Sequence, residues 1–129
     1  MKTVFVVDDS GINLSMADDA LSDHYDVITI ASASTMFELI EKIIPDIILL
    51  DIMMPDMDGF EAMRRLRAEK KSVEIPVIFL TSKNDTVTES LGYEMGAADF
   101  IMKPFNREML LDRIESILKA AENSKTAGE

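Results

Sequence analysis

The sequence contains no cysteine and only one histidine, His24. The absence of cysteine excludes disulfides, thiolate chemistry, and zinc or iron–sulfur sites with cysteine ligands. No apolar run is long enough to span a membrane, and the apolar start at residues 3–7 is too short for a signal peptide. We therefore expect a soluble, cytoplasmic protein that makes no membrane contact, with His24 in a surface turn.

Basic residues are scarce as well. The chain has 13 Lys and Arg against 24 Asp and Glu, which gives a formal net charge of −11. Phosphate binding needs a basic surface, so this balance argues against nucleic acid as a direct partner. The one basic cluster lies at residues 64–71, with Glu69 inside it and Glu61 three residues before it. Mixed charges of this kind are typical of a solvated helix face.

The 129 residues, 47% of them hydrophobic, suffice for one domain with a full core. Short apolar runs alternate with segments of helical period, the pattern of an α/β domain with a parallel sheet. The predicted strands are residues 3–7, 27–30, 47–50, 77–80 and 100–102. Thr29 interrupts the second run, which makes it the best candidate for an edge strand.

The predicted helices are residues 10–22, 33–44, 60–71, 85–95 and 106–121. Ser10 is a good N-cap for the first, Pro45 stops the second, and Gly96 can cap the C-terminus of the fourth. Residues 122–129 show no apolar periodicity, so we expect the domain to span residues 1–121 and to be followed by a flexible tail.

Four of the predicted strands end on polar residues of different kinds. Asp8 and Asp9 follow the first strand, Asp51 the third, Thr81 the fourth and Lys103 the fifth. The carboxyl ends of parallel strands share one edge, where open α/β sheets bind ligands. In the flavodoxin-like order 2-1-3-4-5, which is borrowed from that known fold, the first and third strands are neighbours and the three aspartates meet.

Three adjacent carboxylates repel one another unless a cation neutralises them. Oxygen ligands alone favour magnesium, manganese or calcium, and so few protein ligands suit Mg²⁺ best. An aspartate can also act as a nucleophile and form an acyl phosphate, and Asp51 is the candidate. Lys103 would supply positive charge to phosphoryl oxygens and Thr81 a hydroxyl donor, so the set suits phosphoryl transfer.

Signature residues in four separated segments resemble the receiver domains of two-component response regulators over residues 2–121. They are Asp8-Asp9, Asp51, the Ile-Met-Met-Pro-Asp-Met-Asp-Gly that follows Asp51, Leu80-Thr81-Ser82, and Asp99-Phe100-Ile101-Met102-Lys103-Pro104-Phe105. The resemblance implies that Asp51 is the phosphoacceptor and that Asp9 binds Mg²⁺ directly. It places Asp8 near the metal, acting largely through water, and adds the backbone carbonyl of Met53 to the ligands.

The same resemblance implies that Thr81 and Phe100 form a switch pair and that Lys103 contacts the phosphoryl group, with a cis peptide before Pro104. The expected donor is a sensor histidine kinase or a histidine phosphotransfer protein. The expected output is a downstream protein that binds the face made by the fourth helix, fifth strand and fifth helix. The only expected chemistry is self-phosphorylation and autodephosphorylation at Asp51, so the chain is not expected to be an enzyme.

Other interpretations remain open at this stage. Taken alone, each polar strand end is most often a solvated loop residue, and Phe100 could be plain core. A receiver fold can serve as a scaffold that needs no phosphorylation. A phosphatase with an aspartate nucleophile predicts a second acid where Met53 stands, and a phosphate-loop nucleotide binder predicts glycines that are missing after the first strand.

Overall fold

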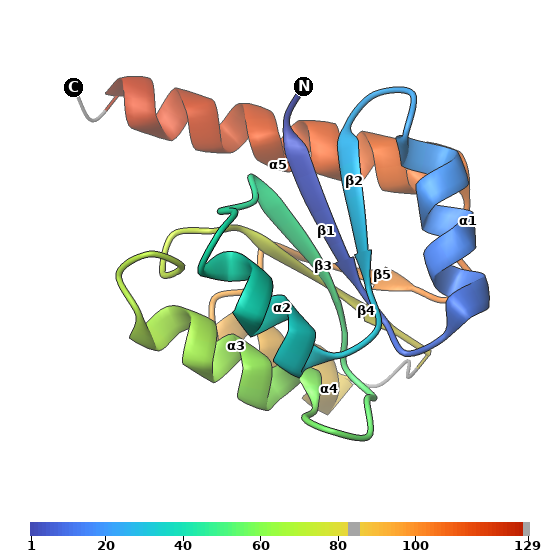
Figure 1. The fold of residues 1–129 in the computed structure, drawn as a ribbon. Helices are drawn as coiled ribbons and strands as arrows, with labels where there is room; N and C mark the ends of the chain where they lie inside the picture. The colour runs from blue at the N-terminus through green and yellow to red at the C-terminus, as the bar shows by residue number, and fades with distance from the viewer. Residues whose placement is uncertain (83–85, 128–129) are drawn as a thin grey trace.

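The computed structural model describes residues 1–82 and 86–127, the stretch 124–127 by its backbone alone. A parallel sheet of five strands in the order β2-β1-β3-β4-β5 lies between two layers of helices (Figure 1). The strands are β1 (Thr3–Val7), β2 (Asp26–Ile30), β3 (Ile47–Asp51), β4 (Val77–Thr81) and β5 (Asp99–Met102). The helices are α1 (Gly11–Leu21), α2 (Ala33–Ile40), α3 (Gly59–Ala68), α4 (Thr86–Glu94) and α5 (Arg107–Ala127). The predicted fold class and strand order are confirmed.

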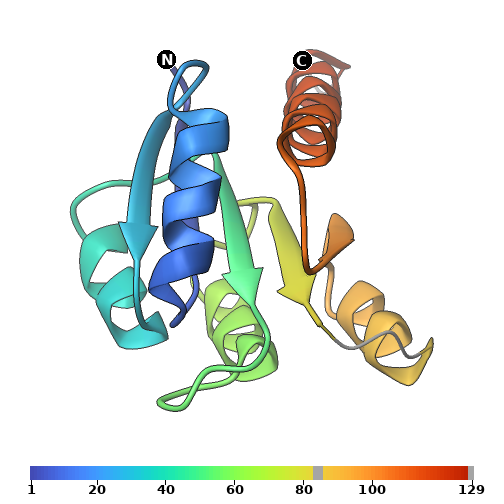
Figure 2. The same ribbon diagram turned by 90° about the vertical axis from the view of Figure 1, so that its right-hand side faces the viewer.

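The core forms one hydrophobic cluster on each face of the sheet. In β1, Val4 and Val6 belong to the cluster under α1 and α5, whereas Phe5 and Val7 belong to the cluster under α2 and α3. This alternation follows from the two-residue period of a strand. Figures 1 and 2 show α1 and α5 on one side of the sheet and α2, α3 and α4 on the other. Strand β2 is the partly exposed edge, as the polar Thr29 predicts.

Local capping fixes the helix starts next to the carboxyl ends of the strands. The side chain of Ser10 accepts a hydrogen bond from the Asn13 backbone N–H at the start of α1. Asp58 caps α3 in the same way, with 2.8 Å between its Oδ1 and the backbone nitrogen of Glu61. These caps satisfy backbone donors that a helix leaves unpaired, and so they hold the loops that carry the polar strand ends.

Helix α2 is shorter than the sequence pattern predicts. It ends at Ile40 instead of residue 44, because the chain turns there with the N–H groups of Lys42 and Ile43 both donating to the Leu39 carbonyl. Ile43, which lies beyond the end of the helix, is therefore 39% exposed. Pro45 disfavours a helical conformation only at residue 44, directly before it, so the end of α2 at Ile40 is set by the turn and not by the proline.

The last helix was predicted to end at residue 121, but α5 continues to Ala127. The flexibility of residues 122–129 stays a prediction. No glycine or proline interrupts the sequence between Arg107 and Ala127, and a solvent-facing helix needs no apolar period. Glu122, in the continued part, forms an ion pair with Lys2 at 3.2 Å. Of the expected fourth helix, Asp85 lies outside the described residues. None of the helices in the described ranges is long and apolar enough to cross a membrane.

Candidate functional site

Asp8 is a buried carboxylate held in place from the first turn of α1. Its Oδ1 accepts a hydrogen bond from the Ser10 N–H at 2.9 Å, and its Oδ2 accepts one from the Asn13 side-chain amide at 3.2 Å. Its side chain is 0% exposed. A buried carboxylate is tolerated only when it is paired or hydrogen-bonded, and α1 supplies part of that compensation.

Asp51 lies beside Asp8 because β1 and β3 are neighbours in the sheet. It is the last residue of β3 and is almost fully buried. The Met53 N–H donates to its Oδ1 at 3.3 Å. Lys103 reaches both carboxylates, with its Nζ 2.9 Å from Oδ2 of Asp8 and 3.0 Å from Oδ1 of Asp51. The structure thus brings together three strand ends that are far apart in the sequence.

Lys103 is positioned by the end of β5. Its backbone N–H donates to the Thr81 carbonyl at 2.8 Å, which extends the β4–β5 pairing by one residue. The peptide bond between Lys103 and Pro104 is cis, as predicted. In the strand order, β5 and β1 lie on opposite sides of β3, so Lys103 and Asp8 approach Asp51 from opposite directions along the sheet.

Asp9 completes an acidic cluster suited to a divalent cation. One carboxylate oxygen from each of Asp8, Asp9 and Asp51 lies within 4.8 Å of the other two, and Asp9 is the exposed member. Three carboxylates and the Lys103 ammonium have a formal charge of −3 + 1 = −2. A hard divalent cation would balance that charge, and oxygen-only donors are the ligands that such cations take. The residues present therefore fit the predicted metal.

The electrostatics of the cluster appear in the pKa of Asp51. Burial raises that pKa from 3.8 to about 6, and the charge of Asp8 raises it too, although the hydrogen bond from Lys103 opposes the shift. Burial by itself would lower the pKa of Lys103, but its hydrogen bonds to Asp8 and Asp51 outweigh burial and raise it. Lys103 therefore stays an ammonium group, while Asp51 is held as an anion at a cost.

The predicted switch residues lie at the same edge and just behind it. Thr81 is buried at the end of β4, adjacent in register to the β5 end that carries Lys103. Phe100 lies on the opposite face of β5, under α4, with its ring centroid 5.4 Å from that of Phe79 and 5.2 Å from that of Tyr93. Phe100 is 9% exposed. Its contribution to the core is thus clear, and its switch role stays a prediction.

Some residues around the site were not expected from the sequence. Ser10 was expected only as a helix cap, yet together with Asn13 it also anchors Asp8. Ser10 directly follows the two aspartates and Asn13 lies about one helical turn after them, and these positions are the only signal. Gly92 is buried in the last turn of α4 against Phe100. A glycine inside a helical segment was its signal, because glycine is a poor helix former.

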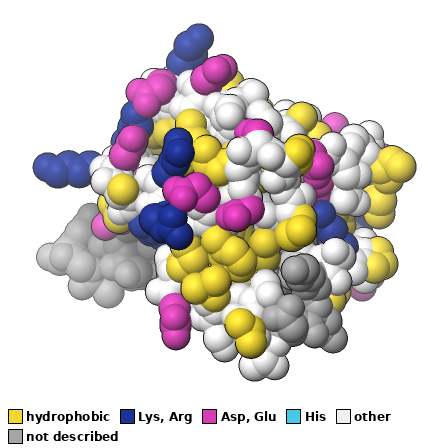
Figure 3. Space-filling model, turned by 90° about the horizontal axis from the view of Figure 1, so that it is seen from below, with side chains coloured by type: hydrophobic (Ala, Val, Ile, Leu, Met, Phe, Trp, Pro, Cys, Tyr) yellow, Lys and Arg dark blue, Asp and Glu magenta, His cyan; other side chains and the backbone are white. Residues whose placement is uncertain are grey.

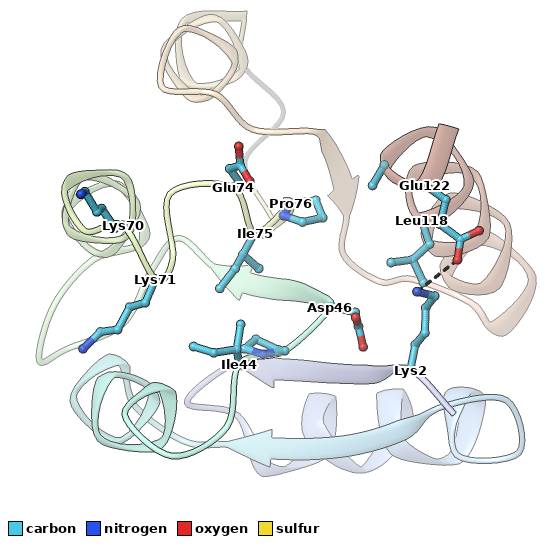
Figure 4. Close-up of a pocket in the computed structure, with 12 residues that line it drawn as sticks. Lys2, Ile44, Asp46, Lys70, Lys71, Glu74, Ile75, Pro76, Leu118 and Glu122 are labelled. Atoms are coloured by element: carbon cyan, nitrogen blue, oxygen red, sulfur yellow. Dashed lines mark ion pairs between the residues drawn. The ribbon is translucent and has the colours of Figure 1, made fainter. Parts of the chain in front are cut away.

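A cavity of about 270 Å³ lies at the opposite edge of the sheet, far from the acidic cluster (Figure 4). The residues that precede β1, β3 and β4 contribute Lys2, Asp46 and Pro76 to its wall. Asp46 is already engaged, since its Oδ2 accepts from the Thr3 N–H at 2.7 Å. Three lysines line this cavity with three carboxylates, so it offers no charge of one sign to select a ligand.

Comparison with known proteins points to one family. The family model of the response regulator receiver domain matches residues 4–115. The chain is 34% identical over 117 residues to a probable cyclic di-GMP phosphodiesterase of Vibrio cholerae, covering 91% of this chain and 26% of that protein. It is 36% identical over 121 residues to the DNA-binding response regulator MtrA of Mycolicibacterium smegmatis, covering 93% and 52%.

Solved structures agree with this fold, and one of them also agrees in size. The chemotaxis protein CheY4 of Vibrio cholerae is 32% identical and superposes with a TM-score of 0.85, covering 90% of this chain and 98% of that one. The curated relatives are longer, and this chain spans about a quarter to about half of their length. The likeness to them therefore concerns the part of each protein that resembles this chain.

Proposed function

Since the chain belongs to the response regulator receiver domain family, whose members are regulatory switches of two-component signalling, we propose that its switch is driven by phosphorylation of Asp51. One observation carries this proposal. Asp51 is buried at the end of a central strand, with Lys103 at 3.0 Å and two further carboxylates around it. The other acids of the cluster fit the proposal less well, because Asp8 is tied to α1 by two hydrogen bonds and Asp9 is exposed.

The proposed step transfers a phosphoryl group from a phosphohistidine to Asp51. A carboxylate oxygen of Asp51 forms the new O–P bond as the N–P bond breaks, and the imidazole nitrogen keeps the electron pair and takes a proton. Asp8, Asp9, Asp51 and the carbonyl of Met53 would hold Mg²⁺, which when bound neutralises charge on the phosphoryl oxygens. A sensor histidine kinase or a histidine phosphotransfer protein is the proposed donor.

Lys103 links the acceptor to the rest of the molecule. Its ammonium group now bridges Asp8 and Asp51, and a phosphoryl group on Asp51 would offer it oxygens of higher charge. We propose that Thr81 turns toward the same oxygens and that the ring of Phe100 follows. Receiver signalling then depends on a partner that prefers one of the two arrangements.

The proposed output surface is made by α4, β5 and α5. On α4, Val87 is 79% exposed and Leu91 42% exposed, and Met102 on β5 is 38% exposed. Figure 3 views the molecule of Figure 1 from below and shows hydrophobic side chains gathered in a patch with charged side chains along one side of it. Exposed apolar groups of this kind mark surfaces that bind proteins. The acidic balance of the chain supports a protein partner and not direct contact with nucleic acid, and we propose that it works in the cytoplasm.

The test is intact mass measurement after incubation with Mg²⁺ and acetyl phosphate. We expect a gain of one phosphoryl mass in the wild type, and no gain with EDTA or in Asp51→Asn. Asp56→Asn is the matched control, because Asp56 is an exposed loop carboxylate that accepts hydrogen bonds from Ser34, so this variant should still gain the mass. If the wild type neither gains a phosphoryl group from acetyl phosphate nor binds the mimic beryllofluoride, the result would instead favour a scaffold that functions without phosphorylation.

A further inference from the structure

Arg67 lies on α3, but its surroundings are not those of a solvated basic face. Arg64 and Arg65, on the same helix, both pair with the carboxylate of Glu61. Arg67 is half-buried instead, and all of its hydrogen-bond partners among the described residues are backbone carbonyl oxygens. Burying a charge is costly unless hydrogen bonds compensate for the lost water, and these carbonyls supply the compensation.

The guanidinium group of Arg67 joins two segments that follow different helices. Its Nη1 donates to the Ile75 carbonyl at 2.9 Å and to the Ser72 carbonyl at 3.4 Å, both in the loop between α3 and β4. Its Nη2 donates to the carbonyl of Gly96 at 3.2 Å, just after the end of α4. A Cβ on Gly96 would lie only 3.4 Å from Nε of Arg67, so the guanidinium lies directly against this turn. One side chain therefore ties the end of α4 to α3 and to the segment that enters β4.

Helix α4 has few features of its own that hold it in place. Of its residues Thr86–Glu94, Gly92 alone is buried, so no large apolar side chain anchors the helix in the core. Its last turn contains no basic residue and ends on Glu94, although the free carbonyls at a helix C-terminus favour a cation. Arg67 supplies that missing cation from the neighbouring helix α3.

We infer that Arg67 is a positioning residue that caps α4 from α3 and makes the C-terminal end of α4 the fixed point of that helix. The other end of α4 follows β4, whose last residue is Thr81. The inference rests on the proposed function, in which Thr81 turns toward a phosphoryl group on Asp51. A movement that begins at Thr81 then reaches α4 at its start and turns the helix about the end that Arg67 holds.

A fixed C-terminal end decides which part of the proposed output surface moves. Val87, in the first turn of α4, is 79% exposed. At about 1.5 Å per residue it lies about 10 Å along the axis from Glu94, so a turn of about 10° would displace it by about 2 Å. Glu94 itself, beside the turn that Arg67 holds, would hardly move. A partner that distinguishes the two states should therefore contact the first turn of α4.

The experiment compares amide hydrogen exchange in Arg67→Met and in wild type, both unphosphorylated, residue by residue by NMR. The reporters are three amides that donate to carbonyls of α4 and close its C-terminal end, those of Met95, Gly96 and Ala97. We expect them to exchange about tenfold faster in Arg67→Met, because the cap that holds this end is lost. Equal rates in the two proteins would overturn the inference.

Two further variants show whether the effect belongs to the cap. Arg64→Met is the matched control, because Arg64 is an exposed arginine of the same helix that pairs with Glu61, so the three amides should exchange as in wild type. Glu94→Lys places a cation in the last turn of α4 itself. In the Arg67→Met background it should slow the exchange of the same amides again, and in wild type it should change little. No recovery in the double variant would overturn the inference.

A measurement on wild type keeps the test decisive if Arg67→Met folds poorly. When Mg²⁺ and beryllofluoride are added, the amide chemical shifts of α4 should change most in its first turn, around Val87, and least at Gly96. Changes at Gly96 as large as those at Val87 would overturn the fixed point. Absence of beryllofluoride binding would count against Asp51 as acceptor, and the exchange rates of the unphosphorylated proteins would still decide whether Arg67 caps α4.

Discussion

Replacing Asp51 by asparagine should stabilise the metal-free protein at neutral pH. The pKa of Asp51 is raised from 3.8 to about 6, chiefly by burial. A raised carboxyl pKa means that the folded state binds the proton more tightly than the unfolded state. The stability that comes from this proton is present below pH 3.8 and is lost as the pH rises from 3.8 through about 6. At pH 7 the folded protein therefore carries a buried charge that asparagine removes.

The size of the effect follows from the shift. A difference of 6 − 3.8 = 2.2 pKa units at about 1.36 kcal/mol per unit gives roughly 3 kcal/mol as an upper value. The variant also removes one of the two carboxylates that hold Lys103, which offsets part of the gain. We expect the free energy of unfolding to rise by about 1–2 kcal/mol at pH 7 and the gain to disappear by about pH 4.

Urea unfolding in EDTA at a series of pH values measures this change. Asp56→Asn is a control in which we expect the change in stability to have the opposite sign. The slight burial of Asp56 by itself would raise its pKa, but the hydrogen bonds from Ser34 outweigh burial and lower that pKa. That control should be slightly less stable than wild type at pH 7. The reasoning is refuted if Asp51→Asn is less stable than wild type at pH 7, or if its gain does not depend on pH. Adding Mg²⁺ at ten times its dissociation constant should stabilise wild type by about 1.4 kcal/mol, and the variant less.

Three further variants test other parts of the structure, each by the same unfolding assay. Lys103→Met should cost about 2–3 kcal/mol at pH 7 and less near pH 5, because it leaves two buried carboxylates without their cation; equal losses at both pH values would contradict this. Gly59→Ala should cost about 2 kcal/mol or more, since its Cβ would lie 2.7 Å from the Asp51 carbonyl oxygen and 2.8 Å from the Ile52 Cα, which are backbone atoms. A loss no larger than that of Gly11→Ala, where the added Cβ meets nothing within 4 Å, would show that the loop relaxes freely. Asp58→Ala removes the cap of α3 and should cost about 1 kcal/mol, and an unchanged stability would mean that water replaces the cap.

The sequence pattern predicted the strands and their polar ends well, because β3 and β4 are buried along their whole length and read as unbroken apolar runs. Helix ends were harder to predict. At Ile40 a local turn ended α2 although apolar residues continued, and at Ala121 α5 continued although they stopped. Apolar periodicity reports which side of a helix is buried, and a helix can run on in solvent or stop while the chain is still apolar.

Parts of the site depend on contacts between elements that no single segment reveals. The acidic residues were predicted from their positions, but which of them pairs with Lys103 depends on how β5 lies across the sheet. Asp8 and Asp51 share the ammonium group, and Asp9, its sequence neighbour, faces out. The close packing of Gly92 is hidden for the same reason, because the ring of Phe100 that it contacts comes from β5.

The short strand β5 joins the two halves of the proposed switch. Lys103 follows its last residue and reaches the acidic cluster on one side, while Phe100 faces α4 on the other. As an edge strand, β5 is paired in the sheet with β4 alone. In the proposed mechanism, a phosphoryl group on Asp51 would pull on Lys103 and thereby on the strand that also carries Phe100.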